Sequence, residues 1–591
     1  MDELPFRPVG GLSCDEVHAQ MDTFYVDSMP SGSESEHDMS SDIEDETAMV
    51  SLPVSAFEEE NLSVSDSEEE DESENIPLSV LKQQWSKHKI PVWSDVHRPD
   101  PLLQFTETSG IPQFIKDIEN PTPYILFKLF ITDQFIDTLV FQTNLYAEQE
   151  KLSTGKTYLS TNPCEIKAFL GLNLLMGIKR SPSYKDYWST APELHDAFIS
   201  SVMTQKRFGW LLSHLHLVDN SLMPSRTSPN YDKLYKIRPM MDLLLHNFEK
   251  CLNPDQVVVV DESMIKFKGR SSLKQYMPKK PIKRGYKIWM LADKTGYCLK
   301  FEMYTGKSST GDVEKCLGAR VVTNLIKHLQ DKNHVLYIDN FFNSVELLQQ
   351  LKEKKIHAVG TVNGNRRHMP KFKPDKSLKR GDMQWFTSDT SLLATKWKDK
   401  RCVHMLSNYH QPEDVGQVKR KEKNGQTIEV PCPQVVIDYN SNMNGVDIFD
   451  QRLSYYKIDR RSKKWWHRIF FYLLDASIVN SNNIYNRLKL PQISAKDFRR
   501  SVINGLLSET LVNPKRNSFI PSEVEIKKFK PYVPIEIRQQ SSAHQPTRGT
   551  RRRCAVCSTK ANPVRTDWLC SICKVPLCLG KNKDCFQNYH A

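Results

Sequence analysis

The chain has 591 residues, 39% of them hydrophobic, and a formal net charge of +10 at pH 7. Its most apolar segment, residues 164–178, is shorter than the ~18 uninterrupted apolar residues that a membrane-spanning helix needs. These values exclude an integral membrane protein, and we expect no signal peptide.

The N-terminal segment is strongly acidic. Residues 1–80 hold 23 Asp and Glu and one basic residue, Arg7, which gives this segment a charge of −22 and leaves +32 on the rest of the chain. High charge with few bulky apolar groups predicts that residues 1–105 form a disordered tail. The basic excess on the remainder favours binding to a polyanion such as DNA through counterion release.

Residues 106–255 show amphipathic patterns typical of helices. Beyond them, the hydrophobic patterns change to short strands that alternate with helices. The expected elements are, in order, strands at 256–260, 286–291 and 298–304, a helix at 321–329, a strand at 335–338, a helix at 344–355 and a strand at 357–362. Three antiparallel strands followed by helix, strand, helix and strand predict a mixed α/β, RNase H-like fold.

Four aspartates occupy notable positions in this pattern. Asp261 and Asp339 each directly follow an apolar, β-rich run, and Asp447 and Asp450 stand three residues apart in GVDIFDQRLSYY. Two such strands side by side, with a helix that presents both later carboxylates on one face, could hold divalent metal ions. For any single aspartate, a turn residue that ends a strand is the simpler interpretation. The combination favours a metal-dependent nuclease site.

Several motifs resemble those of the piggyBac superfamily of cut-and-paste DNA transposases. They are LYKIRP, DES, KPIKRGYKIW, YIDNFFNS and YNSNMNGVDIFDQ, and the resemblance runs from about Leu126 to the C-terminus. It implies an RNase H-like core in which Asp261, Asp339 and Asp447 bind two Mg²⁺ ions, for which Mn²⁺ can substitute, with Asp450 as a supporting carboxylate. It also implies transposon terminal repeats as double-stranded DNA substrate, hairpin ends and TTAA target sites. No GxSxG, Walker or HExxH motif suggests a different chemistry.

The resemblance extends to the organisation of the chain. The implied domains are a helical dimerisation and DNA-binding domain (106–255 and 456–532), a catalytic domain (256–366 and 434–455), an insertion domain (367–433), a linker (533–550) and a cysteine-rich zinc-binding domain (551–591). Because two DNA ends must be cut and joined in concert, we expect a homodimer. We expect it to act in the nucleus, with no membrane partner.

Basic and aromatic residues near these motifs are candidate DNA contacts, although any one basic run can simply be a solvated surface. The candidates are Lys236, Arg238, Lys280, Lys283, Lys287, Lys464 and Trp465. The family places a tryptophan at the position of Trp465 against the flipped end of its hairpin. The neighbouring Trp466 is more simply a core residue.

Six of the 13 cysteines lie between residues 554 and 585. Their spacing predicts a cross-brace zinc module of RING or PHD type, in which metal supplies the folding free energy that so small a core lacks. The predicted ligands are Cys554, Cys557, Cys570, Cys573, Cys578, Cys585 and His590. Two zinc sites need an eighth ligand. His544 lies well upstream and Asp584 is a poor substitute, so the sequence leaves this ligand open. A disulfide framework would require a secreted protein.

The sequence therefore predicts a Mg²⁺-dependent transposase. The alternative is a domesticated relative that binds DNA or chromatin in a sequence-specific way without cleaving it. A ubiquitin ligase built on the RING-like tail is a weaker third hypothesis, because nothing in the first 530 residues suggests it.

Overall fold

The computed structural model describes residues 90–512 and 544–590, except for gaps at 98–102, 156, 279, 307–316, 423–424, 463, 560–561 and 581–582. Most of the predicted acidic tail, the end of the second helical segment (513–532) and most of the linker lie outside the described residues.

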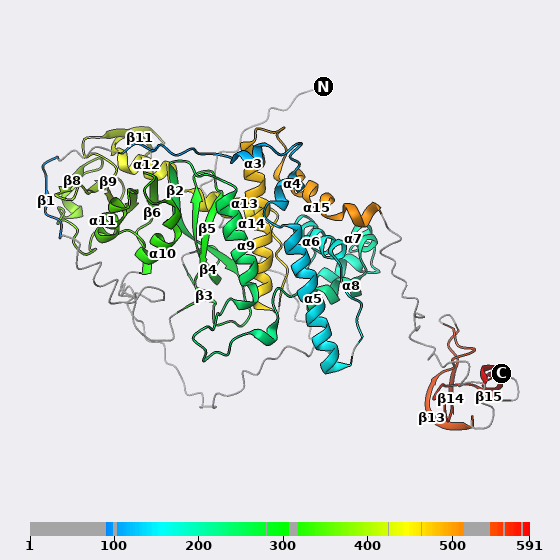
Figure 1. The fold of residues 1–591 in the computed structure, drawn as a ribbon. Coiled ribbons are helices and arrows are strands. Elements are labelled where there is room, and N and C mark those ends of the chain that lie inside the picture. Colours follow the sequence, from blue (N-terminus) through cyan, green and yellow to red (C-terminus); the bar gives the residue numbers. More distant parts are fainter. Residues whose placement is uncertain are drawn as a thin grey trace, which may run out of the picture. The chain divides into compact units, whose positions relative to one another are not determined.

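The centre of the fold is a mixed sheet whose middle strands follow the expected order (Figure 1). These strands are β2 (Val257–Lys266), β4 (Arg284–Asp293), β5 (Cys298–Met303), β6 (Val335–Ile338) and β7 (His357–Thr361). β4 pairs antiparallel with both β2 and β5, whereas β6 lies parallel to β2 and β7 lies parallel to β6. The crossovers are α10 (Leu317–Leu325) and α11 (Val345–Glu353). Helical crossovers allow parallel pairing, and the turn at 293–296 allows antiparallel pairing.

The same sheet continues beyond β7 into residues 367–433. The additional strands are β8 (Met383–Ser388), β9 (Leu393–Lys398) and β10 (Cys402–Ser407), in the order β8-β9-β10-β7. The short β3 (Gln275–Tyr276) pairs with β4, and β11 (Val415–Lys421) and β12 (Thr427–Pro433) form a separate hairpin.

A short N-terminal strand, β1 (Trp93–Ser94), covers the edge of the sheet by pairing with β8. The Trp93 indole donates a hydrogen bond of 2.7 Å to the carbonyl oxygen of His368, and the Val92 amide donates to Asp389 at 2.9 Å. The expectation that the disordered tail extends to residue 105 is therefore wrong for residues 90–97. Tertiary pairing with a strand almost 300 residues away orders a segment whose local composition does not predict a strand.

Helices pack against the sheet and against one another. They are α3 (Gln113–Lys116), α4 (Pro123–Lys128), α5 (Asp133–Thr154), α6 (Pro163–Ile178), α7 (Ala197–Val202), α8 (Gln205–His214), α9 (Arg238–Lys250), α12 (Gln434–Asn442), α13 (Gly445–Tyr455), α14 (Trp465–Arg487) and α15 (Ala495–Val512). α14 is buried on nearly all sides because α4, α9, α13, α15 and β2 all contact it. No helix among the described residues is long and apolar enough to cross a lipid bilayer.

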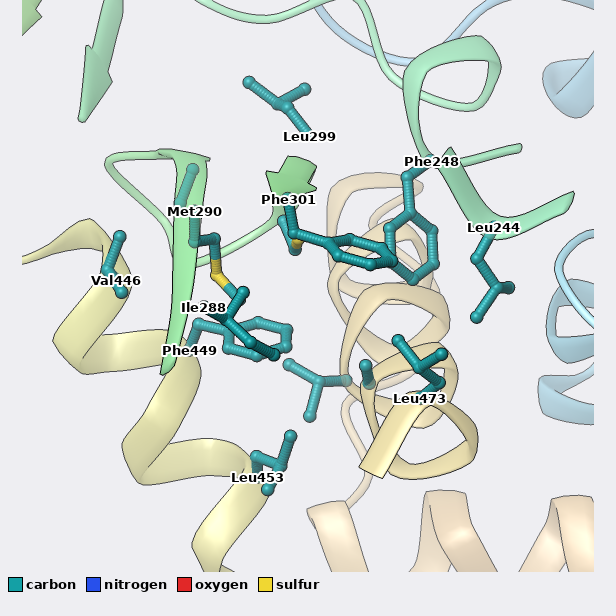
Figure 2. Close-up of a cluster of buried hydrophobic side chains, with 14 of the residues drawn as sticks. Leu244, Phe248, Ile288, Met290, Leu299, Phe301, Val446, Phe449, Leu453 and Leu473 are labelled. Carbon is teal, nitrogen blue, oxygen red and sulfur yellow. The ribbon is translucent and has the colours of Figure 1, made fainter. Parts of the chain in front are cut away.

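A continuous hydrophobic core joins the sheet to these helices. Figure 2 shows Ile288 and Met290 of β4, Phe301 of β5, Phe449 of α13 and Leu473 of α14 in one cluster of buried side chains. All five side chains are buried, so the helix that carries Asp447 and Asp450 is fixed against the strands by apolar packing.

The C-terminal module has its own small core. Its elements are β13 (Pro546–Arg553), β14 (Arg565–Cys570), β15 (Leu579–Gly580), β16 (Lys583–Asp584) and α18 (Cys585–His590). Ala555, Cys570, Val575, Leu577 and Phe586 form its buried cluster. Because β13 begins at Pro546, the expected start of the module at residue 551 is too late: its first strand includes residues assigned to the linker.

Candidate active site

Strand register places Asp261 beside Asp339. β2 and β6 pair in parallel up to the partners Val260 and Ile338, so the next residue of each strand is an aspartate at the same end of the pairing. This is the juxtaposition expected from the apolar runs. β2 does not end there, however, because antiparallel pairing with β4 carries it on to Lys266.

Close packing of α13 against the β4–β5 turn positions Asp447 and Asp450. A Cβ atom at Gly445 would lie 2.4 Å from the carbonyl oxygen of Asp293, so only glycine allows this approach. Arg452 donates a hydrogen bond of 2.7 Å to the carbonyl oxygen of Thr295 in the same turn. The helix is therefore anchored at both ends of the segment that carries the two aspartates.

The carboxylates form one electrostatic cluster. Burial raises the pKa of Asp261 to about 7; Lys280 opposes the rise, whereas Asp339 and Asp447 add to it. Burial also raises the pKa of Asp339. These three side chains, from β2, the end of β6 and α13, thus share one field, as the sequence pattern predicts.

Asp450 lies deeper in the fold than Asp447, which is exposed. Burial raises the pKa of Asp450 to about 7; the Ser263 hydroxyl, which donates a hydrogen bond of 2.7 Å to its Oδ1, lowers it, and Asp447 raises it. The Tyr472 hydroxyl lies 3.3 Å from that of Ser263. This chain from α14 through β2 to α13 fixes the orientation of the Asp450 carboxyl group.

A glutamate not singled out from the sequence organises the basic side chains beside the cluster. Glu262 pairs with Lys287 at 2.7 Å and with Lys280 at 3.4 Å. Burial lowers the pKa of Lys280, but Asp261 and Glu262 together raise it more, so the net shift is upward. The sequence did contain a signal for Glu262, because it directly follows Asp261 in the motif DES. Successive side chains of a strand point to opposite faces of the sheet, so this pair predicts one carboxylate on each face.

The basic candidates differ in accessibility. Lys283 is exposed on the segment before β4, and Lys236 is half-buried in the turn before α9. Arg238 is held by Asp232 through two hydrogen bonds, of 2.7 and 3.0 Å, and this geometry favours a structural role for it.

The two candidates at the start of α14 are also engaged with the protein. The Lys464 ammonium donates a hydrogen bond of 2.6 Å to the Ser213 carbonyl oxygen. Trp465 is half-buried against the core, and its carbonyl oxygen accepts a hydrogen bond of 3.4 Å from the Tyr286 hydroxyl. Trp466 is 3% exposed and is a core residue.

The aspartate cluster has the chemistry of a site for divalent cations. Its hard oxygen donors are those that Mg²⁺ prefers, and two of its carboxyl groups have pKa values raised to about 7 despite the neighbouring Lys280 ammonium. Further positive charge would stabilise the ionised forms. Among the described residues, no three of these aspartates have carboxylate oxygens that all lie within 4.8 Å of one another, in contrast to the potential ligands of the C-terminal module.

Titration of these groups predicts a pH dependence of stability. The pKa of Asp261 rises from an ordinary 3.8 to about 7 on folding, so between these values the folded chain keeps a proton that the unfolded chain has released. The free energy of unfolding should therefore fall, on the order of a few kcal/mol, as pH rises through this window without added Mg²⁺. Asp261→Asn should remove this contribution, as measured by urea unfolding at about pH 5.5 and about pH 8.

Buried histidines change the free energy of unfolding in the opposite direction. Burial lowers the pKa of His328 to about 4, so protonation of the unfolded chain reduces the stability of the folded chain as pH falls. The histidines are the same in wild type and Asp261→Asn, so the difference in pH dependence of the free energy of unfolding between the two proteins reports the contribution of Asp261. An identical pH dependence in both proteins would contradict the raised pKa.

The C-terminal module contains two sets of four potential zinc ligands, and the ligand atoms within each set lie within 4.8 Å of one another. The first set is Cys554, Cys557, Cys578 and Cys585; the second is His544, Cys570, Cys573 and His590. His544 thus lies where the eighth potential ligand, which the sequence left open, is needed. The ligand pairs alternate between the two sets along the chain, which is the cross-brace arrangement.

Surrounding contacts fit zinc binding. The His590 Nδ1 lies 2.7 Å from the Phe586 carbonyl oxygen, to which its N–H can donate, leaving Nε2, 3.6 Å from the Cys573 sulfur, available to a metal. Asp584 has another role, because its carboxylate accepts a hydrogen bond of 3.1 Å from the Gln587 amide at the start of α18. All six cysteines are free of disulfide bonds.

The chain is similar to known transposases and their relatives. A family model described as Transposase IS4 matches residues 122–482, a range that includes all four aspartates. Two human (Homo sapiens) proteins are similar over most of their length. PiggyBac transposable element-derived protein 2 is 27% identical over 529 residues, 87% of this chain and 82% of that protein. PiggyBac transposable element-derived protein 3 is 28% identical over 479 residues, 79% of this chain and 76% of that protein.

A solved structure supports the same relationship. The cryo-EM structure of the piggyBac transposase synaptic complex with hairpin DNA superposes with a TM-score of 0.60 at 25% identity, covering 81% of this chain and 99% of that chain. The similarity in sequence and the similarity in fold therefore point to the same group of proteins.

Proposed function

Because the chain belongs to the piggyBac superfamily of transposases, we propose that it is a Mg²⁺-dependent enzyme that cuts and joins DNA. The observation that carries this proposal is the convergence of Asp261, Asp339 and Asp447 from β2, the end of β6 and α13. The strand order β5-β4-β2-β6-β7 supports an RNase H-like core. The similarity to a transposase bound to hairpin DNA supports DNA as the substrate.

The residues of the site have distinct roles in this mechanism. Asp261, Asp339 and Asp447 would hold two divalent ions, which supply activation of the attacking oxygen and stabilisation of the leaving oxygen at a phosphodiester. Asp450, oriented by Ser263, adds negative charge behind Asp447. Lys280 balances part of the carboxylate charge. Through its pairing with Glu262 it would also hold the basic segment before β4 close to the DNA strand that is cut.

The mode of transposition is part of the same proposal. The chain would excise an element through hairpin ends and insert it at TTAA sites, with two protomers acting on two ends. The helical residues 106–255 and 456–532 would form the dimerisation and DNA-binding domain around the catalytic residues 256–366 and 434–455. The C-terminal module would bind terminal-repeat DNA through β13, on which Arg551 and Arg552 are exposed.

Nuclear location follows from a DNA substrate. Two basic runs are candidate import signals, Arg551–Arg553 and Arg460–Lys464. The first is the better candidate, because Arg551 and Arg552 are exposed on β13. In the run that starts at Arg460, the first guanidinium is held inside the fold by Asn173 at 3.0 Å and lies over the ring of Phe471.

The test is cleavage of DNA that contains the two genomic flanks of the chain's own gene. The purified protein should nick these flanks with Mg²⁺ or Mn²⁺ and not with Ca²⁺, and light scattering should show two protomers on the DNA. Specific binding of the flanks without cleavage would support the alternative of a domesticated DNA-binding protein. The names of the human relatives, which describe them as derived from transposable elements, make this alternative worth testing.

A further inference from the structure

The loop after β6 presents an exposed aromatic ring next to the Asp339 carboxylate. The Phe341 amide donates a hydrogen bond of 2.9 Å to Asp339 Oδ1, and the Phe341 side chain is 39% exposed. The following residue, Phe342, is only 2% exposed and belongs to the core. One of two adjacent phenylalanines thus anchors the loop while the other faces solvent beside the candidate active site.

Hydrogen bonds fix the backbone of this loop. The Arg366 guanidinium donates to the carbonyl oxygens of Asn340, at 2.8 Å, and of Phe341, at 3.0 Å. The buried Asn343 amide donates to the Thr361 carbonyl oxygen at 3.0 Å. α10 also packs closely on the loop, since a Cβ atom at Gly318 would lie 2.9 Å from the Phe341 carbonyl oxygen. The exposed ring is therefore carried on a rigid support.

A lysine lies against the same ring. The Lys287 ammonium is 4.7 Å from the Phe341 ring centroid and 5.4 Å from that of Trp289, and it pairs with Glu262 at 2.7 Å. Glu262 follows Asp261 in β2, so the cation and the ring are tied to both strands that carry the aspartates. An aromatic face with an adjacent cation is suited to stack a nucleobase and attract its phosphate.

We propose that Phe341 is a stacking surface for an unpaired DNA base next to the scissile phosphate, with Lys287 supporting the ring. This inference rests on the proposed function and extends it by assigning a residue that selects DNA with an unpaired base at the cut. Isolated exposed phenylalanines are common and need no function. Phe341 differs because its backbone is braced by Arg366 and bonded to Asp339.

The position of Phe341 separates it from Trp465. Trp465 begins α14 and is half-buried against the core, whereas Phe341 lies two residues after Asp339 and its amide donates a hydrogen bond to the Asp339 carboxylate. The proposed base therefore lies at the cleaved strand, and the substrate class is a junction between duplex and single-stranded DNA.

The test measures binding without cleavage, in full-length protein that carries Asp447→Asn. The probe is a duplex with an unpaired four-nucleotide 5′ overhang in which 2-aminopurine replaces one overhang base, and a blunt duplex of the same sequence is the reference. Stacking on Phe341 should quench the 2-aminopurine fluorescence. Phe341→Ala should lose the quenching and bind the overhang duplex about tenfold more weakly, with unchanged affinity for the blunt duplex.

Two further substitutions at the same position separate stacking from bulk. Phe341→Trp should keep the quenching because it keeps an aromatic face, whereas Phe341→Leu should lose it although it fills similar space. The matched control is Phe114→Ala. Phe114 is 43% exposed, with the Lys250 ammonium 5.3 Å from its ring centroid, and it belongs to α3, away from the β6 loop in the chain. This control should behave as the parent protein does.

Equal affinity and equal quenching for Phe341→Ala and the parent would overturn the inference, as would a parent that does not distinguish the overhang from the blunt duplex. This binding experiment does not measure cleavage. Failure of the proposed function would instead appear as a wild-type protein that does not cleave DNA, so the two outcomes can be distinguished. Each variant should have the same unfolding temperature as the parent, which checks that the substitution does not disturb the fold.

Discussion

Replacing Asp261, Asp339 or Asp447 by asparagine is expected to reduce Mg²⁺-dependent DNA cleavage by roughly a thousandfold or more, while DNA binding is largely retained. Asparagine keeps the volume of each side chain but removes a charged oxygen ligand. Asp450→Asn should be equal or milder, because Asp450 lies behind Asp447 and is bonded to Ser263. Cleavage is measured as nicked product on denaturing gels, and binding by gel shift.

The matched control is Asp331→Asn. Asp331 lies in the turn before β6, its side chain is 68% exposed, and its backbone has a φ of +64°, which asparagine tolerates as well as aspartate does. This variant should cleave normally. Persistent cleavage in any one of the three active-site variants would remove that residue from the proposed metal ligands.

A second readout does not depend on activity. If Mg²⁺ binds the folded chain and not the unfolded chain, it should raise the unfolding temperature of the wild-type protein. The three asparagine variants should lose most of this increase. They should also be no less stable than wild type without the metal, since each substitution removes one carboxylate from a cluster in which burial raises the pKa values of Asp261 and Asp339.

His544→Ala is expected to lower the zinc content of the C-terminal module from two ions per chain to one and to unfold much of that module. A structural zinc site contributes on the order of 10 kcal/mol to the folding of so small a core, so losing one of its four ligands is severe. Cys557→Ser should have the same effect on the other site. Metal analysis gives the zinc content, and limited proteolysis reports whether residues 544–590 are folded.

The control in this case is Asp584→Asn. Its carboxylate accepts a hydrogen bond from Gln587 and belongs to neither ligand set, so this variant should keep two zinc ions. A fragment that starts at residue 551 should bind a single zinc ion, whereas one that starts at residue 540 should bind two. Two ions in His544→Ala would show that another group completes the site.

The sequence by itself predicted the features that depend on patterns within a short segment. Apolar runs ending at Asp261 and Asp339 predicted two neighbouring strands, because alternating burial and β-branched side chains reveal a strand locally. Parallel register then brings the two aspartates together. The spacing of the cysteines likewise predicted ligand pairs, since a CxxC turn is a local structure. The family motifs predicted the superfamily, and the comparisons confirmed it.

Only the tertiary structure decided how distant segments meet. Ser263 and Asp450 are 187 residues apart, and their hydrogen bond depends on the packing of α13 against β2. The pairing of Glu262 with Lys280 and Lys287 and the pairing of β1 with β8 likewise depend on the tertiary structure.

The potential zinc ligand His544 shows the limit most clearly. It lies 10 residues before the first cysteine of the module, with no spacing motif to connect it to the others. The pairing of β13 with β14 places it 3.1 Å from the Cys570 sulfur. Local periodicity encodes which face of an element is buried, whereas the partner of each side chain is set by long-range packing of the whole fold.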